Sequence, residues 1–452
     1  MHIMLIPIIL ASCLTSFTSA QQFAGSVINN TLPNVFGSEI AYFNILDANK
    51  KNTTLINYSS YNSQGQRLTP SNVKRAVIFI HGELRDPYLY MQDILTAFGT
   101  NNRSDVTLDN VQMVTPWFTD GDDKGIWPWN ASATHGSTTN VLVWPGSGWI
   151  GGATNEYPWN RKSVSSYDVL DQMIEYFDNK ALFPNMQQIV VAGHSAGGQT
   201  VQRYAMVGNV LSITTPLTYY VANPNSLAWM SASRPLDTSG CPTYDDWKEG
   251  LSNYTNTYGA SLVASGRAAV LANYNSRTIN YGRGLLDTGD DSSTCAPFTT
   301  GVNRNERFFN FIKEFPVSYP STIDYVNVGH DAYGMMSSPA GMNRLFYDNF
   351  DGKGEKFYDY GCPRQQLGDN PYPNPACNVT KPAADAGVFA GWQYEGCFTD
   401  LYNSRSLSDW LSSDNNTTIE SCTQACGGLG YSIAGLEYGN GKSDMIVIIG
   451  NG

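Results

Sequence analysis

The chain has 452 residues, enough for two or three domains. Its 27 Lys and Arg against 39 Asp and Glu give a formal net charge of −12, which argues against a nucleic-acid-binding protein, because such proteins present a basic face. Apolar residues make up 42% and charged residues 15% of the chain, a composition that excludes an intrinsically disordered protein.

The first twenty residues have the features of a secretory signal peptide. An apolar stretch runs from Ile3 to Leu14, and small residues lead to Ala20, after which cleavage is expected. A signal anchor is the alternative, although the stretch is short for a membrane span. No run of about 20 apolar residues follows, so we expect no membrane span once the signal is removed.

Nine Asn-x-Ser/Thr sequons support a secreted, extracellular glycoprotein, since such sites are glycosylated in the secretory pathway. The asparagines are Asn29, Asn52, Asn57, Asn102, Asn130, Asn253, Asn378, Asn415 and Asn416. Secretion also places the cysteines in an oxidising compartment, where disulfides are expected rather than metal sites.

Seven cysteines remain after the signal peptide, which carries Cys13. We expect Cys241 to pair with Cys295 and Cys362 to pair with Cys377. An odd number is then left near the end of the chain, namely Cys397, Cys422 and Cys426. This remainder needs an explanation.

From residue 73 to about residue 350, short apolar runs alternate with amphipathic stretches. Continuous apolar runs separated by helical segments indicate a parallel sheet covered on both faces, so the fold class is α/β, with a doubly wound and mostly parallel sheet. Strands are predicted at 75–80, 111–114, 140–144, 188–192, 217–221 and 278–281, and a covering helix at 163–179.

The segment Gly193-His194-Ser195-Ala196-Gly197 is a G-x-S-x-G motif. It directly follows a predicted strand and precedes a helix-compatible stretch that starts at Gln199. In this strand–turn–helix setting the flanking glycines allow a sharp, strained turn that exposes the serine hydroxyl. A glycine-rich turn without chemistry is the alternative.

A serine nucleophile needs a base and an acid, which follow it in the order acid, then histidine, in doubly wound hydrolases. Only His330 lies downstream of Ser195, in a loop after an apolar run. Asp287 follows the last predicted strand and is the expected acid, with Asp290 and Asp291 as close competitors. The aspartate would orient the imidazole, which would take the serine proton.

The oxyanion hole is expected to use two backbone N–H groups, those of Ala196 and Glu83. Glu83 follows His81-Gly82 at the end of an apolar strand, and its side chain is expected to pair with Arg85.

The remaining histidines are given no catalytic role. His194 is expected to point away from Ser195 and to pack, and His135 lies in a Ser/Thr/Gly-rich loop. No histidines are spaced as metal-ligand pairs, and no Gly-rich phosphate loop follows a strand, so we expect neither a metal nor another cofactor.

The chain resembles the α/β-hydrolase superfamily and, more narrowly, secreted fungal α/β-hydrolases. The matching residues are His81-Gly82, Arg85-Asp86, Pro116-Trp117-Phe118, Trp144, Gly148-Trp149, Gly193 to Gly197, Ala222 to Ser226, Cys241-Pro242, Trp247, Asp287 and His330. The resemblance implies an α/β-hydrolase domain at 21–362 and a triad of Ser195, Asp287 and His330. It names no substrate, because this fold hosts many chemistries.

After a Pro-rich linker at 363–390, a cysteine-containing segment at 391–452 includes the motifs Tyr394 to Asp400, Arg405 to Leu407, Ser421 to Cys426 and Ala434 to Gly439. On these residues the segment resembles a WSC domain, a cysteine-rich carbohydrate-binding module of fungal wall and secreted proteins. From Asn440 onward the family's further cysteines are missing. We expect a partial module with a truncated or misread end, which would fold poorly without its disulfides.

These observations predict a secreted serine hydrolase that cleaves a carboxylic ester through an acyl-enzyme, with peptidase activity as an open alternative. The expected substrate is a small or polysaccharide-linked ester, and the tail would direct the enzyme to cell-wall or plant polysaccharide. Aromatic residues of the segment 224–277 either build the substrate pocket or simply pack. A second hypothesis is a catalytically inert wall- or carbohydrate-binding glycoprotein, which a fluorophosphonate probe would leave unlabelled.

Overall fold

A computed structural model describes residues 32–123, 140–289, 292–318 and 320–352, together with the backbone of four short strands at 23–24, 409–414, 433–438 and 445–450. Several predictions concern residues outside this part: the signal peptide, His135, Asp290, Asp291, the Cys362–Cys377 pair, the linker and the three last cysteines. Contacts divide the chain into two units, Met1–Cys377 and Asn378–Gly452, which are described separately.

The first unit contains one nine-stranded sheet with the order β1-β2-β3-β5-β4-β6-β7-β8-β9. The strands are β1 (Phe23–Ala24), β2 (Ser38–Leu46), β3 (Asn52–Ser60), β4 (Arg75–Ile80), β5 (Val111–Pro116), β6 (Gln188–His194), β7 (Leu217–Ala222), β8 (Thr278–Gly284) and β9 (Thr322–Val326). Pairing is antiparallel from β1 to β3 and between β3 and β5, and parallel from β5 through β9. This strand order is that of the α/β-hydrolase fold, which confirms the predicted fold class.

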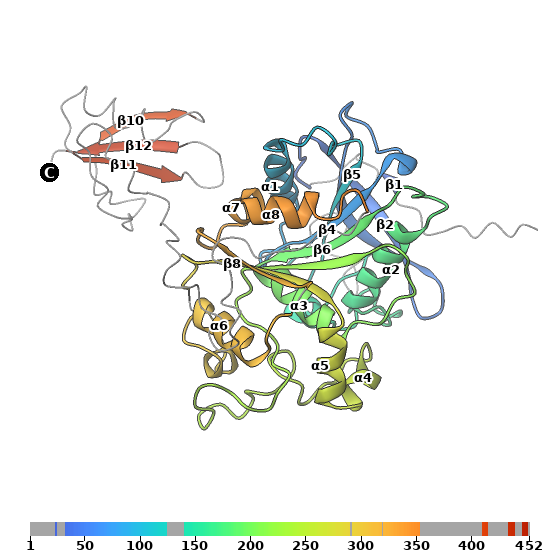
Figure 1. Ribbon diagram of the computed structural model, residues 1–452, viewed down its shortest axis with the longest axis vertical. Helices are drawn as coiled ribbons and strands as arrows, with labels where there is room; N and C mark the ends of the chain where they lie inside the picture. The colour runs from blue at the N-terminus through green and yellow to red at the C-terminus, as the bar shows by residue number, and fades with distance from the viewer. Residues whose placement is uncertain are drawn as a thin grey trace, which may run out of the picture. The chain divides into compact units, whose positions relative to one another are not determined.

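Helices cover both faces of this sheet. They are α1 (Pro87–Gly99), α2 (Ser166–Asp178), α3 (Ala196–Val207), α4 (Ala260–Ala264), α5 (Arg267–Asn275), α6 (Arg304–Glu314), α7 (Ala332–Ser337) and α8 (Pro339–Met342). Short helical turns are η1 (Pro70–Asn72), η2 (Gly121–Asp123), η3 (Gly146–Gly151), η4 (Ala296–Thr299) and η5 (Asn343–Tyr347). Figure 1 shows α1, α7 and α8 on one face and α2 and α3 on the other.

The predicted strand at 140–144 is wrong. Val141 and Val143 form only isolated bridges, because the amides of this segment bond to different partners: Leu142 N–H donates to Thr54 and Trp144 N–H to Thr119. The segment is apolar because it is buried, although it is not a hydrogen-bonded strand of the sheet. The antiparallel strands β2 and β3 were not predicted, since β3 is rich in Asn, Thr and Ser and lacks a continuous apolar run.

The predicted helix at 163–179 is confirmed as α2, and local chemistry explains where it begins. Ser165 forms a capping box with Asp168: the Ser165 hydroxyl accepts from Tyr167 N–H at 3.1 Å, and the Asp168 carboxylate accepts from Ser165 N–H at 2.8 Å. These bonds satisfy amides that have no partner inside the helix. The residues before Ser165 therefore stay outside it.

The two central strands bring together the loops that the site uses. Every residue of β4 and β6 is buried, and Val77 and Phe79 of β4 join Val190 and Ala192 of β6 in one apolar cluster with α1. In the parallel register, Ile80 lies opposite Gly193. The loop after β4 and the turn after β6 thus begin at neighbouring points on the same edge of the sheet.

The disulfide between Cys241 and Cys295 is present, as expected from the sequence. It joins the long segment between β7 and β8 to the turn that precedes η4. By closing a loop that contains Asp287, the bond restricts the unfolded chain around one of the predicted site residues.

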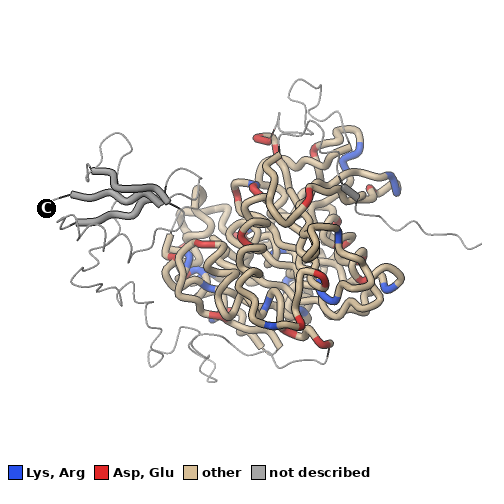
Figure 2. The backbone as a smooth tube through the Cα atoms, turned by 90° about the horizontal axis from the view of Figure 1, so that it is seen from above, with Lys and Arg blue, Asp and Glu red and all other residues tan. Residues whose placement is uncertain are grey.

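Charged residues of both signs are distributed along the first unit: Figure 2 shows Lys and Arg interspersed with Asp and Glu along the described tube.

The sequons of the first unit differ in exposure. Asn52, Asn102 and Asn253 are exposed, so these sequons are open to modification. Asn57 is fully buried in β3, which contradicts its use as a glycosylation site in the folded chain.

In the second unit, a three-stranded antiparallel sheet has the order β10-β12-β11. Its strands are β10 (Asp409–Asp414), β11 (Ile433–Tyr438) and β12 (Met445–Gly450). The central strand is β12, from the apolar segment that departs from the WSC pattern. Across the described residues of the whole chain, no helix has both the length and the apolar character that a membrane span requires.

Candidate active site

Ser195 lies at a sharp turn between β6 and α3. Its backbone has φ 58° and ψ −122°, a conformation that L-residues rarely adopt. The flanking glycines make this turn possible, because a Cβ at Gly193 would collide with the Gly197 backbone and a Cβ at Gly197 with the Ile80 carbonyl oxygen. The G-x-S-x-G motif therefore has the geometry of a nucleophile elbow.

The structure brings Ser195, His330 and Asp287 into one hydrogen-bonded chain. His330 Nε2 lies 2.9 Å from Ser195 Oγ, and His330 Nδ1 lies 2.9 Å from Asp287 Oδ2. The His330 side chain is 30% exposed, whereas that of Asp287 is almost fully buried. A carboxylate that accepts from Nδ1 leaves Nε2 unprotonated and able to take the proton of Ser195 Oγ.

Asp287 is held by two buried arginines as well as by His330. Arg283 of β8 lies 3.1 Å from Asp287 Oδ2 and also donates to the Asp287 carbonyl, and Arg304 of α6 lies 2.7 Å from Oδ1. Burial raises the pKa of Asp287, but the hydrogen bond from His330 and the charges of the arginines outweigh it and lower the pKa well below its ordinary value. Asp287 is thus an ionised, rigidly held carboxylate.

The peptide between Gly82 and Glu83 is fixed in orientation. Its carbonyl, that of Gly82, accepts from His81 Nδ1 at 2.8 Å and from Arg85 N–H at 3.2 Å. Because the peptide is trans, the Glu83 N–H points the opposite way from this carbonyl. Ala196 N–H is the first amide of α3, and amides of the first turn have no partner inside their helix. The use of these two N–H groups as an oxyanion hole stays a prediction.

The His81 ring, which donates to the Gly82 carbonyl, must be neutral and must carry its proton on Nδ1. Phe118 N–H donates to His81 Nε2 at 3.0 Å, so the proton must lie on Nδ1, which donates to Gly82. Full burial lowers the pKa of His81 to about 4, which keeps the ring neutral. The sequence identified His81 only as part of a His-Gly pair, and this positioning role was missed.

The expected ion pair between Glu83 and Arg85 is wrong. Arg85 Nε instead lies 2.9 Å from Asp123 and 3.2 Å from Asp120, two acids that follow β5. Arg85 Nη1 donates to the Glu83 carbonyl at 2.9 Å. The arginine therefore fastens the loop to the neighbouring strand end, where Asp120 and Asp123 are buried, whereas the Glu83 side chain is exposed.

His194 packs, as expected, but it packs on the histidine of the site. Its ring centroid lies 4.7 Å from that of His330, and its Nδ1 lies 3.3 Å from the Tyr90 hydroxyl. Burial, followed by the charge of His330, lowers the pKa of His194 well below its ordinary value. A neutral His194 thus forms one wall behind His330.

Two aromatic residues between β7 and β8 pack in the interior. Trp229 is buried against Phe311 and Phe315, and the Tyr258 hydroxyl donates to Asp171 in the interior. These contacts favour the packing interpretation for Trp229 and Tyr258 over substrate stacking.

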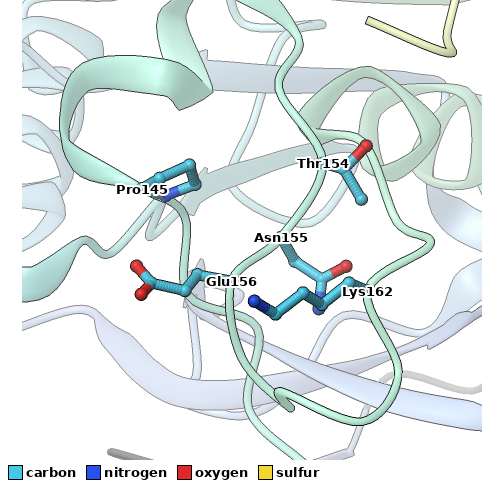
Figure 3. Close-up of a pocket in the computed structure, with 5 residues that line it drawn as sticks. All are labelled: Pro145, Thr154, Asn155, Glu156 and Lys162. Carbon is cyan, nitrogen blue, oxygen red and sulfur yellow. The ribbon is translucent and has the colours of Figure 1, made fainter.

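A separate pocket of about 450 Å³ lies beside the loop after η3 (Figure 3). It is lined by Pro145, Thr154, Asn155, Glu156 and Lys162, and by none of the elbow residues. Among the described residues, no group of His, Cys, Asp and Glu side chains could hold a metal ion.

Comparison with known proteins identifies part of the second unit. Residues 394–441 match the WSC domain. A WSC domain-containing protein of Arthroderma benhamiae is 43% identical over 58 residues, which are 13% of this chain and only 6% of that protein. The chain thus spans a small fraction of this relative's length.

Solved structures that resemble the chain include a poly(aspartic acid) hydrolase from Sphingomonas sp. KT-1, with 17% identity, TM-score 0.43, and coverage of 67% of this chain and 96% of that one. A poly(3-hydroxybutyrate) depolymerase from Bordetella parapertussis has 18% identity, TM-score 0.44, and coverage of 71% and 91%. A siderophore hydrolase from Aspergillus nidulans has 10% identity, TM-score 0.37, and coverage of 70% and 97%. By its strand order the first unit has an α/β-hydrolase fold, and residues 394–441 of the second unit match the WSC domain.

Proposed function

We propose that this protein is a secreted serine hydrolase that cleaves carboxylic esters. One observation carries the proposal: Ser195 Oγ, the His330 imidazole and the Asp287 carboxylate form an unbroken chain of hydrogen bonds, with the serine at a strained elbow. Such a chain is the minimum that an acyl-transfer enzyme of this kind needs, namely a nucleophile, its base and the group that orients the base.

The first half of the reaction is acylation of the serine. As His330 Nε2 takes the proton of Ser195 Oγ, the oxygen attacks the acyl carbon and the carbonyl becomes an oxyanion. The N–H groups of Glu83 and Ala196 would donate to that oxyanion, and one such donor is worth roughly 3–4 kcal/mol in the transition state. The imidazolium then protonates the leaving alcohol, and the acyl-enzyme remains.

The second half repeats these steps with water. His330 takes a proton from water, which attacks the acyl carbon, and the returning proton frees Ser195 as the carboxylic acid leaves. Throughout, the ionised Asp287 holds Nδ1 and stabilises the imidazolium. Because the arginines keep this carboxylate charged, it is not expected to take the proton itself.

A panel of substrates tests the reaction class. We expect the mature protein to hydrolyse 4-nitrophenyl esters and acetylated polysaccharide, and to cleave peptide anilides far more slowly, since esters have the better leaving group. A protein that cleaves the anilides as fast as the esters would be a peptidase, and one that cleaves neither would be the inert binding protein.

We further propose that the C-terminal segment binds glycan and holds the enzyme at a cell wall or at plant polysaccharide. Its match to the WSC domain over residues 394–441 supports this proposal. In a pull-down on chitin, β-glucan and yeast wall, the full chain should be retained more strongly than a variant lacking residues 391–452. Equal retention of the two proteins would show that residues 391–452 do not contribute to glycan binding.

A further inference from the structure

Asn223 is the first residue after β7, and it lies between the strands that lead to the triad residues. It is fully buried and has φ 42°, a left-handed conformation that asparagine adopts more readily than most residues. Its backbone N–H donates to Gly282 of β8 at 3.0 Å. The residue is therefore fixed at the edge of the sheet where the elbow is also found.

The side-chain amide of Asn223 connects two further strand ends. Its Oδ1 accepts from Gly284 N–H at 2.7 Å, at the end of β8, and its Nδ2 donates to the Gly329 carbonyl at 3.0 Å. Gly284 lies three residues before Asp287, and Gly329 directly precedes His330. One side chain thus bonds to the backbone three residues before Asp287 and to the residue next to His330.

Gly284 allows the loop before His330 to come this close. A Cβ at Gly284 would lie 2.6 Å from the Val328 carbonyl oxygen and 2.9 Å from both the Gly329 oxygen and Asn223 Nδ2. The close contact between β8 and the loop before His330 therefore needs both a glycine at position 284 and the side-chain amide of Asn223.

We propose that Asn223 is a positioning residue that sets the place of His330 relative to Ser195, an inference that rests on the proposed function. The two bonds require an acceptor for Gly284 N–H and a donor for the Gly329 carbonyl on the same planar group. An amide supplies both, whereas a carboxylate supplies acceptors only and repels the carbonyl. Aspartate has nearly the same shape, so Asn223→Asp removes the donor without creating a cavity and places an acceptor, with its negative charge, against the Gly329 carbonyl.

The test compares Asn223→Asp with Asn273→Asp, which removes an amide that donates to the carbonyls of Met206 and Gly208 on another part of the molecule. We expect Asn223→Asp to lower kcat for a 4-nitrophenyl ester about 10- to 100-fold with KM unchanged, since a small displacement of a base costs this much. Asn273→Asp should leave both constants within twofold. An Asn223→Asp enzyme with wild-type kcat would overturn the proposal.

A double-mutant cycle separates positioning from a general loss of structure. If Asn223 acts through His330, Asn223→Asp should have no further effect on the residual rate of His330→Ala. The same fold loss in both backgrounds would contradict the proposal. Should Asn223→Asp fail to fold by thermal melting, Asn223→Gly replaces it in the cycle, because glycine accepts the positive φ. A His330→Ala variant with wild-type activity would instead contradict the proposed function, in which His330 is the base.

Discussion

Replacing Ser195 by alanine is expected to lower kcat for ester hydrolysis by a factor of about 10⁴ to 10⁶ while leaving the fold intact. The variant loses the nucleophile, and its smaller side chain fits the strained turn, where the neighbouring glycines provide the space. The measurement is steady-state hydrolysis of a 4-nitrophenyl ester, with thermal melting to verify folding.

Ser276→Ala is the matched control for this experiment. Ser276 is exposed after α5, and its hydroxyl donates only to the nearby Asn273 carbonyl among the bonds described. This control should keep wild-type kcat. A Ser195→Ala enzyme that is folded and keeps even a tenth of the activity would show that the hydrolysis uses another group.

Asp287→Asn is expected to damage both catalysis and stability. The amide can present a donor to His330 Nδ1 and so favour the wrong tautomer, which we expect to lower kcat about 10³- to 10⁴-fold. It also removes the negative charge that lies 3.1 Å from the fully buried Arg283, and breaking such a buried pair costs about 3–5 kcal/mol of unfolding free energy. Ester kinetics and denaturant unfolding measure the two effects.

The pH dependence of the stability loss follows from the sign of the pKa shift. The folded-state pKa of Asp287 lies below the ordinary value of 3.8, so its stabilisation is fully present above that value and is lost as pH falls through the folded-state pKa. The difference between wild type and Asp287→Asn should therefore be constant from pH 5 to 8 and shrink only in stronger acid.

Asp331→Asn serves as the control for charge, because Asp331 is exposed and follows His330 directly in the chain. Asp331→Asn should show neither the loss of kcat nor the loss of unfolding free energy expected for Asp287→Asn. An Asp287→Asn variant as stable as Asp331→Asn would contradict the role given to the two arginines.

The elbow and its partners could be predicted because their signals are local or depend on chain order. The glycines around Ser195 belong to one short motif, and a single downstream histidine left His330 without a competitor. Asp287 was harder to choose, since Asp290 and Asp291 follow it closely in the sequence. These two aspartates lie outside the described residues. The structure brings Asp287 to His330, with its second oxygen on Arg304.

The groups that hold the site could not be predicted, because they come from distant parts of the chain. Asn223 meets Gly329 across more than a hundred residues, and the acids that bind Arg85 follow a different strand. The sequence around Asn223 and Arg85 does not indicate which distant groups these side chains will bond to. The error at 140–144 has a related cause, since burial makes a segment apolar whether or not it joins the sheet.

The most direct test of a reactive Ser195 is labelling of the folded protein with a fluorophosphonate probe, followed by peptide mass spectrometry. The proximity of Ser195 Oγ to His330 Nε2 predicts one adduct, on the peptide that contains Ser195, and no adduct on the Ser195→Ala variant. A folded protein that stays unlabelled, or one labelled equally in the Ser195→Ala variant, would contradict the account.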